Sequence, residues 1–206
     1  MSELNLPAKK PEETRSQVIN DIVLVLTVVF LTDFLMADFL GMQFYVPTIL
    51  LWVLMPFLVE LLLRKGTIRN LGFLRTKFRR SLPLYIALAG GWAVASPYFA
   101  TFFFHPAFVE ELCFRGFLQT RLERLFSVRR SIIIQAAVFA AYHIPAALPV
   151  SKLGFSPGGF FYPVFALLLG IVNGMVYAKT RNLFVTMAIH GSLLAAFELL
   201  TFLYFG

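Results

Sequence analysis

Apolar residues run through this chain in blocks of about 20, the length that crosses a hydrocarbon core of about 30 Å at 1.5 Å rise per residue. Shorter polar or basic stretches separate the blocks. The pattern predicts seven helices, at about 18–40, 43–63, 81–104, 106–126, 131–149, 160–179 and 183–205. We therefore expect an all-α fold, a polytopic membrane helical bundle with about seven transmembrane helices.

Two parts follow from this pattern. Residues 1–17 form a polar tail, and residues 18–206 form a single integral-membrane domain whose core, with the polar motifs described below, covers about 80–200. The first long apolar block has no short hydrophobic stretch with a cleavage pattern before it, so we interpret it as a retained span.

Composition supports a membrane protein. The chain is 59% hydrophobic and 14% charged, whereas ordinary soluble domains are about 45–50% apolar and about 25% charged. A single cysteine, Cys113, excludes an internal disulfide.

The net charge of +7 is concentrated in loops, because 7 of the 18 Lys and Arg residues lie between Arg64 and Arg80. Under the positive-inside rule this distribution predicts a multi-pass protein of the cell membrane with a cytoplasmic N-terminus. Anionic lipid head groups are the partner that such a loop suits. No recognition module accompanies the charge, so we expect no nucleic-acid partner.

Ionisable side chains inside the apolar blocks are the candidates for chemistry, because burying them in lipid is costly. Glu111 and Arg115 are four residues apart on one helix face, the favourable order for an ion pair. Glu110 is rotated by about 100° from Glu111. It therefore has no cation on its own helix, which suits a general base in a poorly solvated cavity.

Two histidines lie in later apolar blocks. His143 follows Phe139 by one helical turn and precedes Pro145, so the helix is expected to kink or end there. His190 lies in the last block, where a side-chain N–H is suited to stabilising an oxyanion. Estimated depths allow Glu110 and both histidines to converge on one cavity.

A glutamate with two histidines is also a set of metal ligands, and a metal site stays an alternative. The usual zinc spacing H-E-x-x-H and the di-iron spacing E-x-x-H are both missing from the sequence. We therefore expect no metal and no cofactor.

Three smaller features have structural interpretations. Gly170 and Gly174 form a small-residue pattern that allows close helix approach, and Asn173 beside them is suited to a hydrogen bond across helices or to lining the cavity. Glu60 and Arg64 have the spacing of an i, i+4 pair.

Three motifs, each on its own apolar block, occur in a fixed order: Glu110-Glu111-x-x-x-Arg115, then Phe139-x-x-x-His143, then His190. Together they resemble the CPBP family, the type II CAAX prenyl endopeptidases and bacteriocin-processing or immunity (Abi) proteins. The stretches Leu71-Gly-Phe and Thr180-Arg-Asn-Leu are similar to family members as well.

The resemblance implies an intramembrane glutamate protease that needs no metal and cleaves a membrane-associated peptide or prenylated protein near its C-terminus. By the family pattern, Glu110 and His143 would activate water and His190 would hold the oxyanion. Glu111 and Arg115 would shape the site.

One position departs from the family pattern. Leu194 stands where the third motif usually carries Asn or a similar polar residue, four positions after the histidine. Ser192 is about 200° round the helix from His190, so Asn173 is the better substitute as an oxyanion donor.

Two other functions stay open. Leu194 motivates a non-catalytic membrane protein of the same fold, acting as an immunity or scaffold partner. Asp33 and Glu198 within spans motivate a small transporter or proton-linked carrier. The sequence does not indicate an oligomeric state.

Overall fold

The computed structural model describes residues 13–32, 45–73, 78–144 and 161–205, and the regular structure within these ranges is helical throughout. The elements are α1 (Arg15–Thr32), α2 (Tyr45–Leu58), η3 (Val59–Leu63), η4 (Ile68–Leu71), α3 (Phe78–Ala95), α4 (Pro97–Phe102), η5 (Phe103–Phe108), α5 (Val109–Glu111), η6 (Leu112–Gln119), α6 (Thr120–Leu122), α7 (Val128–Tyr142), α9 (Phe161–Thr180) and α10 (Leu183–Phe205). The prediction of an all-α fold is confirmed for these residues.

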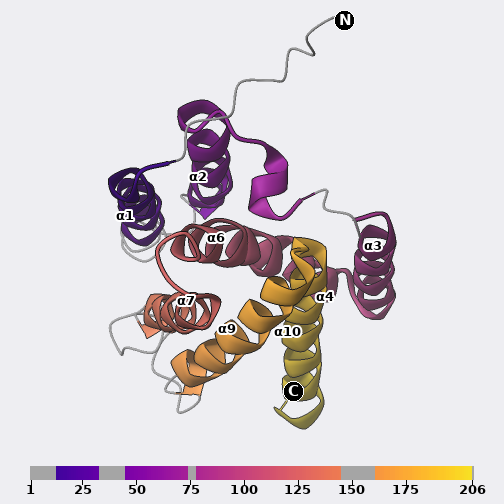
Figure 1. Ribbon diagram of the computed structural model, residues 1–206. Helices are drawn as coiled ribbons and strands as arrows, with labels where there is room; N and C mark the ends of the chain where they lie inside the picture. Colours follow the sequence, from indigo (N-terminus) through magenta and orange to yellow (C-terminus); the bar gives the residue numbers. More distant parts are fainter. Residues whose placement is uncertain (1–12, 33–44, 74–77, 145–160, 206) are drawn as a thin grey trace, which may run out of the picture.

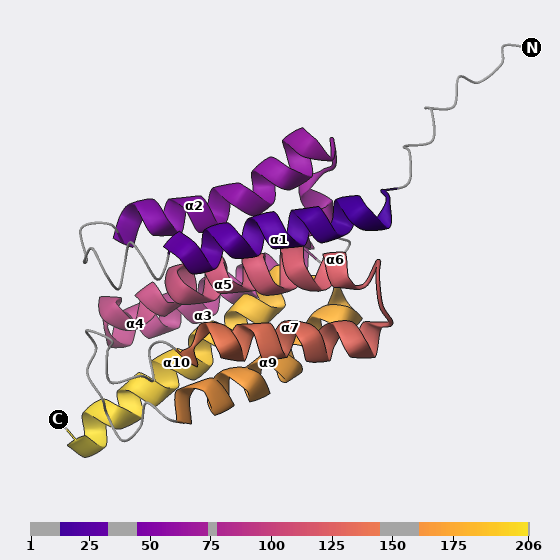
Figure 2. The same cartoon turned by 90° about the vertical axis from the view of Figure 1, so that its left-hand side faces the viewer.

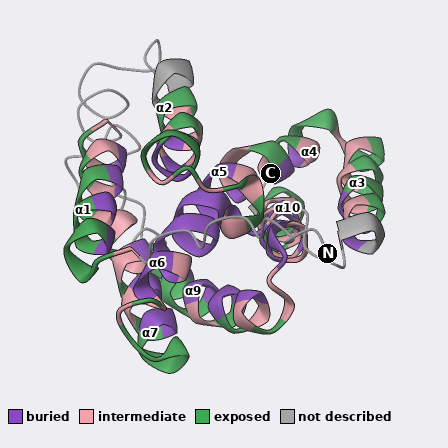
Figure 3. Cartoon of the chain, turned by 45° about the horizontal axis from the view of Figure 1, so that its top comes forward, coloured by how far each residue is buried: buried purple, intermediate pink, exposed green. Residues whose placement is uncertain are grey.

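A central helix, residues 106–122, forms the axis of the molecule and comprises the end of η5 together with α5, η6 and α6. Every residue from Val109 to Gln119 in it is buried (Figure 3). Helices α1 and α2 cover one side of this axis, and α7 and α9 cover the opposite side (Figures 1 and 2). Helix α10 packs against α3, η5 and α9. The two consecutive glutamates thus lie at the centre of the bundle.

The predicted helix at 81–104 is interrupted, which corrects that boundary. Helix α3 ends at Ala95, and Ser96 is extended (φ −164°, ψ 135°) before α4 begins at Pro97. Proline disfavours helical backbone at the preceding residue, and the Ser96 hydroxyl caps the new helix by accepting a hydrogen bond from the Tyr98 N–H. The helix is interrupted again at His105, whose backbone is extended (φ −145°, ψ 125°). The predicted helix start at Pro106 is therefore confirmed.

The other predicted helices match the structure to within a few residues where the chain is described. Helix α7 ends at Tyr142 with His143 as its C-cap, which confirms the expected end before Pro145. Predicted segments 33–40 and 145–149, with Asp33, lie outside the described residues.

Close packing of α7 on α9 depends on Gly170. A Cβ at this position would lie 2.9 Å from the Ala136 Cα, so a larger residue would push the helices apart. The Gln135 side chain donates a 2.7 Å hydrogen bond to the Gly170 carbonyl. The small-residue prediction for Gly170 is confirmed, and a polar bond across the contact stabilises it in an apolar environment.

The stretches Leu71-Gly-Phe and Thr180-Arg-Asn-Leu meet in space. Gly72 has a left-handed backbone (φ +85°), and a Cβ there would lie 2.8 Å from the Tyr177 ring. The Leu183 N–H donates to the Gly72 carbonyl at 3.4 Å. This contact joins the end of η4 to the start of α10.

Large apolar side chains are exposed on most helices, for example Leu62 at 66%, Phe161 at 67% and Phe202 at 68%. So many exposed apolar side chains suit a lipid environment and would be a liability in water. Three helices in the described part of the chain are long and apolar enough to cross a membrane: Arg15–Thr32, Phe161–Thr180 and Leu183–Tyr204.

Candidate active site

Glu111 lies at the centre of a buried cluster of polar side chains, here called the pocket cluster, whose other members are Glu110, Arg115, Asn173 and His190. Its side chain is completely buried, and its Oε1 atom has three partners from three other parts of the chain. Arg115 Nη1 lies 3.1 Å away, His190 Nδ1 2.9 Å away, and Asn173 Nδ2 donates a 2.9 Å hydrogen bond. The i, i+4 spacing predicted the ion pair with Arg115, and α9 and α10 supply the other two contacts.

The Arg115 guanidinium is also fully buried, and its surroundings fix its position. Its Cζ atom lies 4.5 Å from the centre of the Phe139 ring, within cation–π range. Its Nη2 lies 3.5 Å from the Leu169 carbonyl oxygen. The cation is therefore held between the central helix, α7 and α9.

Glu110 points to a different side of the central helix from Glu111. Its Oε2 atom lies 3.7 Å from His190 Nε2, and its side chain lines a pocket. Because His190 Nδ1 contacts Glu111, the imidazole lies between the two carboxylates. A carboxylate accepts hydrogen bonds, so His190 Nδ1 carries a proton, and Nε2 carries one only when the ring is an imidazolium.

His143 is oriented by the end of its own helix. Its Nδ1 lies 2.8 Å from the Phe139 carbonyl oxygen, and its ring stands edge-on to the Phe139 ring at 4.7 Å between centroids. Since a carbonyl only accepts, Nδ1 is the protonated nitrogen, and Nε2 of the neutral ring is an acceptor. The helix end predicted from Pro145 therefore provides the carbonyl that sets the histidine tautomer.

One pocket brings Glu110, His143 and His190 together. Its remaining lining residues are Pro106, Phe139, Tyr162, Phe165, Ala166, Leu169 and Leu194. The polar atoms of the three predicted residues thus share a small, mostly apolar cavity, while Glu111, Arg115 and Asn173 lie behind it.

Two residues considered for the oxyanion lie away from this pocket lining. The Asn173 amide donates to Glu111 and, at 3.3 Å, to the Thr186 carbonyl. The Ser192 hydroxyl is buried without a hydrogen-bond partner among the described residues. Leu194 does line the pocket, one turn beyond His190. Sequence reasoning missed Tyr162, because an aromatic residue in an apolar block gives no signal of its own.

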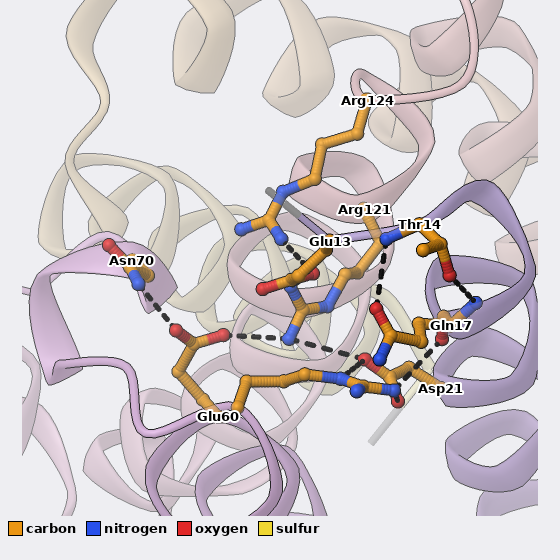
Figure 4. A network of polar contacts seen from close by, with 9 residues as sticks. Glu13, Thr14, Gln17, Asp21, Glu60, Asn70, Arg121 and Arg124 are labelled. Carbon is orange, nitrogen blue, oxygen red and sulfur yellow. Dashed lines mark hydrogen bonds and ion pairs between the residues drawn. The ribbon is translucent and has the colours of Figure 1, made fainter. Parts of the chain in front are cut away.

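A second polar cluster, here called the polar network, lies at the end of the bundle where α1 begins (Figure 4). Its ionised members are Glu13, Asp21, Glu60, Arg64, Arg121 and Arg124. Arg121 Nη2 lies 2.8 Å from Glu60 Oε2, and Arg121 Nη1 lies 2.9 Å from Glu13 Oε2. The network thereby ties α1 and η3 to the end of the central helix.

The expected Glu60–Arg64 pair is replaced by partners within this network. Arg64 Nη2 pairs with Asp21 Oδ1 at 2.6 Å, and Glu60 pairs with Arg121 and accepts a hydrogen bond from Asn70. The i, i+4 spacing did not identify these partners, because Asp21, Asn70 and Arg121 lie on other elements. The Asp21 carboxylate, which accepts hydrogen bonds from Arg64, raises the pKa of that guanidinium.

Among the described residues, no group of three or more His, Cys, Asp and Glu side chains has an arrangement that would hold a metal ion. Cys113 is buried in the core, where its Sγ lies 3.2 Å from the Trp52 carbonyl oxygen. A thiol in such surroundings is a packing residue.

Fold and site together define a class: a membrane-type helical bundle that keeps one carboxylate and two histidines in an apolar-walled pocket at its centre. Residues 91–195, a little more than half of the chain, match the family described as type II CAAX prenyl endopeptidase Rce1-like. The chain belongs to this family of hydrolases, which confirms the resemblance drawn from the motifs. The family and the three apolar helices both indicate a membrane protein. No curated protein and no solved structure matches the chain.

Proposed function

We propose that the protein is a metal-independent intramembrane glutamate endopeptidase. It cleaves a membrane-associated peptide or protein near the C-terminus, and prenylated peptides are the first substrate class to test. The observation that carries the proposal is the shared pocket of Glu110, His143 and His190, with apolar walls suited to a lipid-embedded chain.

In the proposed reaction, Glu110 takes a proton from a water molecule, and His143 Nε2 accepts a hydrogen bond from that water and orients it. The water oxygen attacks the carbonyl carbon of the scissile bond, and the carbonyl electron pair moves to its oxygen. As the C–N bond breaks, the oxyanion electron pair re-forms the carbonyl and the proton held by Glu110 passes to the leaving amine. The products are an amine and a carboxylic acid, which loses its proton to water.

Glu111 and Arg115 act as positioning residues. Glu111 holds His190 through Nδ1, and Arg115 balances the charge of Glu111 so that this carboxylate stays ionised when buried. A His190 imidazolium carries an Nε2–H that can donate to an oxyanion.

The direct test is cleavage by purified protein in liposomes, with prenylated and unprenylated C-terminal peptides and fragments read by mass spectrometry. Glu110→Gln should abolish cleavage, and a chelator should leave it intact. Glu123→Gln is the matched control, because Glu123 pairs with Arg181 and does not line the pocket. Full activity of Glu110→Gln would refute the mechanism, and chelator-sensitive cleavage would favour a metal enzyme.

A second candidate is a non-catalytic immunity or scaffold protein of the same fold, favoured by Leu194 on the pocket wall. A variant changed at Glu110, His143 and His190 together that still complements the cellular phenotype would support it.

The charge distribution also supports a multi-pass arrangement in the cell membrane with a cytoplasmic N-terminus. Protease accessibility of a tag placed before residue 13 in oriented vesicles tests this orientation.

A further inference from the structure

Few hydrogen-bond donors in the pocket are available to a substrate. The Nδ1–H of His143 faces the Phe139 carbonyl, and the Nδ1–H of His190 faces Glu111. His190 Nε2 donates only when the ring is protonated. A tetrahedral intermediate carries a full negative charge on oxygen, and such oxyanions are normally held by two or more aimed donors. The two histidines together supply at most one hydrogen-bond donor to the oxyanion.

Tyr162 is a further lining residue with a hydrogen-bond donor. Apart from Glu110 and the two histidines, the described residues that line the pocket are Pro106, Phe139, Phe165, Ala166, Leu169, Leu194 and Tyr162. Of these, Tyr162 is the one with a polar side chain. Its ring lies 5.4 Å from the His143 ring between centroids, so it is beside the catalytic histidine.

The placement of Tyr162 suits contact with a bound chain. It lies in the first turn of α9, one turn before Phe165 and Ala166, which line the same pocket. Tyr162 is 42% exposed, and its printed contact within the described residues is the ring contact with His143. Tyr162 therefore lies at the exposed border of the pocket and carries a phenolic O–H.

We propose that Tyr162 is a catalytic residue that donates its phenolic hydrogen bond to the oxyanion, in the place that Leu194 leaves apolar. This inference rests on the proposed peptidase function. When water adds to the scissile carbonyl, the oxygen gains the carbonyl electron pair and the Tyr162 O–H points to it. The tyrosine keeps its proton throughout, and the bond weakens again when the intermediate collapses.

The test compares Tyr162→Phe with Tyr98→Phe in the liposome cleavage assay. Tyr98→Phe removes a phenolic hydroxyl from α4, outside the pocket, and serves as the matched control. Loss of one oxyanion donor lowers kcat by about 10²–10³-fold in other enzymes. We expect a fall of about 10²-fold in kcat for Tyr162→Phe with KM nearly unchanged, and wild-type rates for Tyr98→Phe.

A rescue variant separates a catalytic role from a packing role. Leu194→Asn introduces an amide one turn beyond His190, on the pocket wall. In the Tyr162→Phe background it should restore about tenfold or more of the lost kcat, since a second donor again reaches the oxyanion. A hydroxyl that only supports packing would give no such rescue, and its loss would lower thermal stability instead.

The outcomes distinguish a failure of the role given to Tyr162 from a failure of the proposed peptidase function. Cleavage by the wild type that is lost in Glu110→Gln but unchanged in Tyr162→Phe would overturn the role of Tyr162 and leave the peptidase standing. A Tyr162→Phe defect confined to KM, or one that Leu194→Asn fails to relieve, would overturn it too. Cleavage by neither wild type nor variants would overturn both proposals.

Discussion

Two clusters of buried charge lie on the central helix, and they are built differently. The polar network contains three carboxylates, Glu13, Asp21 and Glu60, and three guanidinium groups, Arg64, Arg121 and Arg124. The pocket cluster contains two carboxylates and only one guanidinium. The network is balanced in charge, whereas the pocket has one carboxylate more than its guanidinium can balance.

The distribution of unsatisfied polar atoms follows the same division. Among buried side chains of the described residues, atoms without a hydrogen-bond partner include Glu111 Oε2 and Asn173 Oδ1 beside the pocket and Gln119 Oε1 and Gln135 Oε1 at the packing of η6 and α7 on α9, and none belongs to the polar network. A buried polar atom left unsatisfied costs about 1–3 kcal/mol. The network is thus balanced in charge and satisfied in its hydrogen bonds, so we assign it to stability, and we assign the pocket with its additional carboxylate to function.

The largest expected effect comes from Arg115→Met. It leaves Glu110 and Glu111 buried near each other without their guanidinium. Removing one partner of a buried ion pair costs about 3–5 kcal/mol. We therefore expect a loss of that size in the free energy of unfolding, measured by denaturant titration in micelles, together with loss of cleavage in the protein that remains folded. A stable, active variant would contradict the role given to this cation.

Arg121→Met is the matching change in the polar network. It should also destabilise the protein by about 3–5 kcal/mol, because buried Glu60 loses its ion-pair partner while Asp21 and Glu13 keep Arg64 and Arg124. The cleavage rate per folded molecule should stay within a factor of about two of the wild type, since Arg121 does not line the pocket. A large loss of kcat would show that the two clusters are coupled.

Sequence patterns predicted the elements that depend on local rules. The last two helices, the break at Pro106 and the Glu111–Arg115 pair all followed from apolar block length, proline chemistry or i, i+4 spacing. The interruption at Ser96 was not predicted. Ser96-Pro97 is a signal for the start of a helix, but it lies within a continuous apolar block that was interpreted as one helix. The partners of Glu60 and Arg64 were missed because they lie on other helices.

The pocket was predictable only in part, because the contacts that orient its residues come from other helices. Apolar context singled out Glu110, His143 and His190, and the structure brings them to one pocket. The groups that orient these residues come from other helices and follow from the tertiary structure. His190 contacts Glu111 through Nδ1, and Asn173 of α9 donates a hydrogen bond to Glu111. No local pattern marks Tyr162 as a lining residue.

Gly170→Ala tests the contact between α7 and α9. Phe139 of α7 and Ala166 and Leu169 of α9 line the pocket. The added Cβ would meet the Ala136 backbone at 2.9 Å, so α7 and α9 must separate. Overpacking of this kind costs about 1–3 kcal/mol. We expect a lower melting temperature and a modest rise in KM, as the pocket widens. Gly90→Ala is the control, because a Cβ there meets nothing within 4 Å.

The smallest expected effect is the pH dependence that Glu13 gives to the polar network. Burial alone would raise its pKa, but the hydrogen bond from Arg124 and the charges of Arg121 and Arg124 outweigh this, and the pKa falls below 4.5. A lowered pKa means that the contribution is present above pH 4.5 and is lost as pH falls through the folded-state value. Glu13→Gln should flatten the acid limb of a stability–pH curve, and an unchanged limb would contradict the assignment.

The most direct test of the division between the two clusters is a paired comparison of Glu110→Gln and Glu60→Gln. Both remove one buried carboxylate charge, and both proteins are assayed for melting temperature and for cleavage per folded molecule. The account predicts that Glu110→Gln abolishes cleavage with little loss of stability, whereas Glu60→Gln melts at a lower temperature and cleaves at a rate close to the wild type. Equal rates of cleavage by wild type and Glu110→Gln would contradict the account.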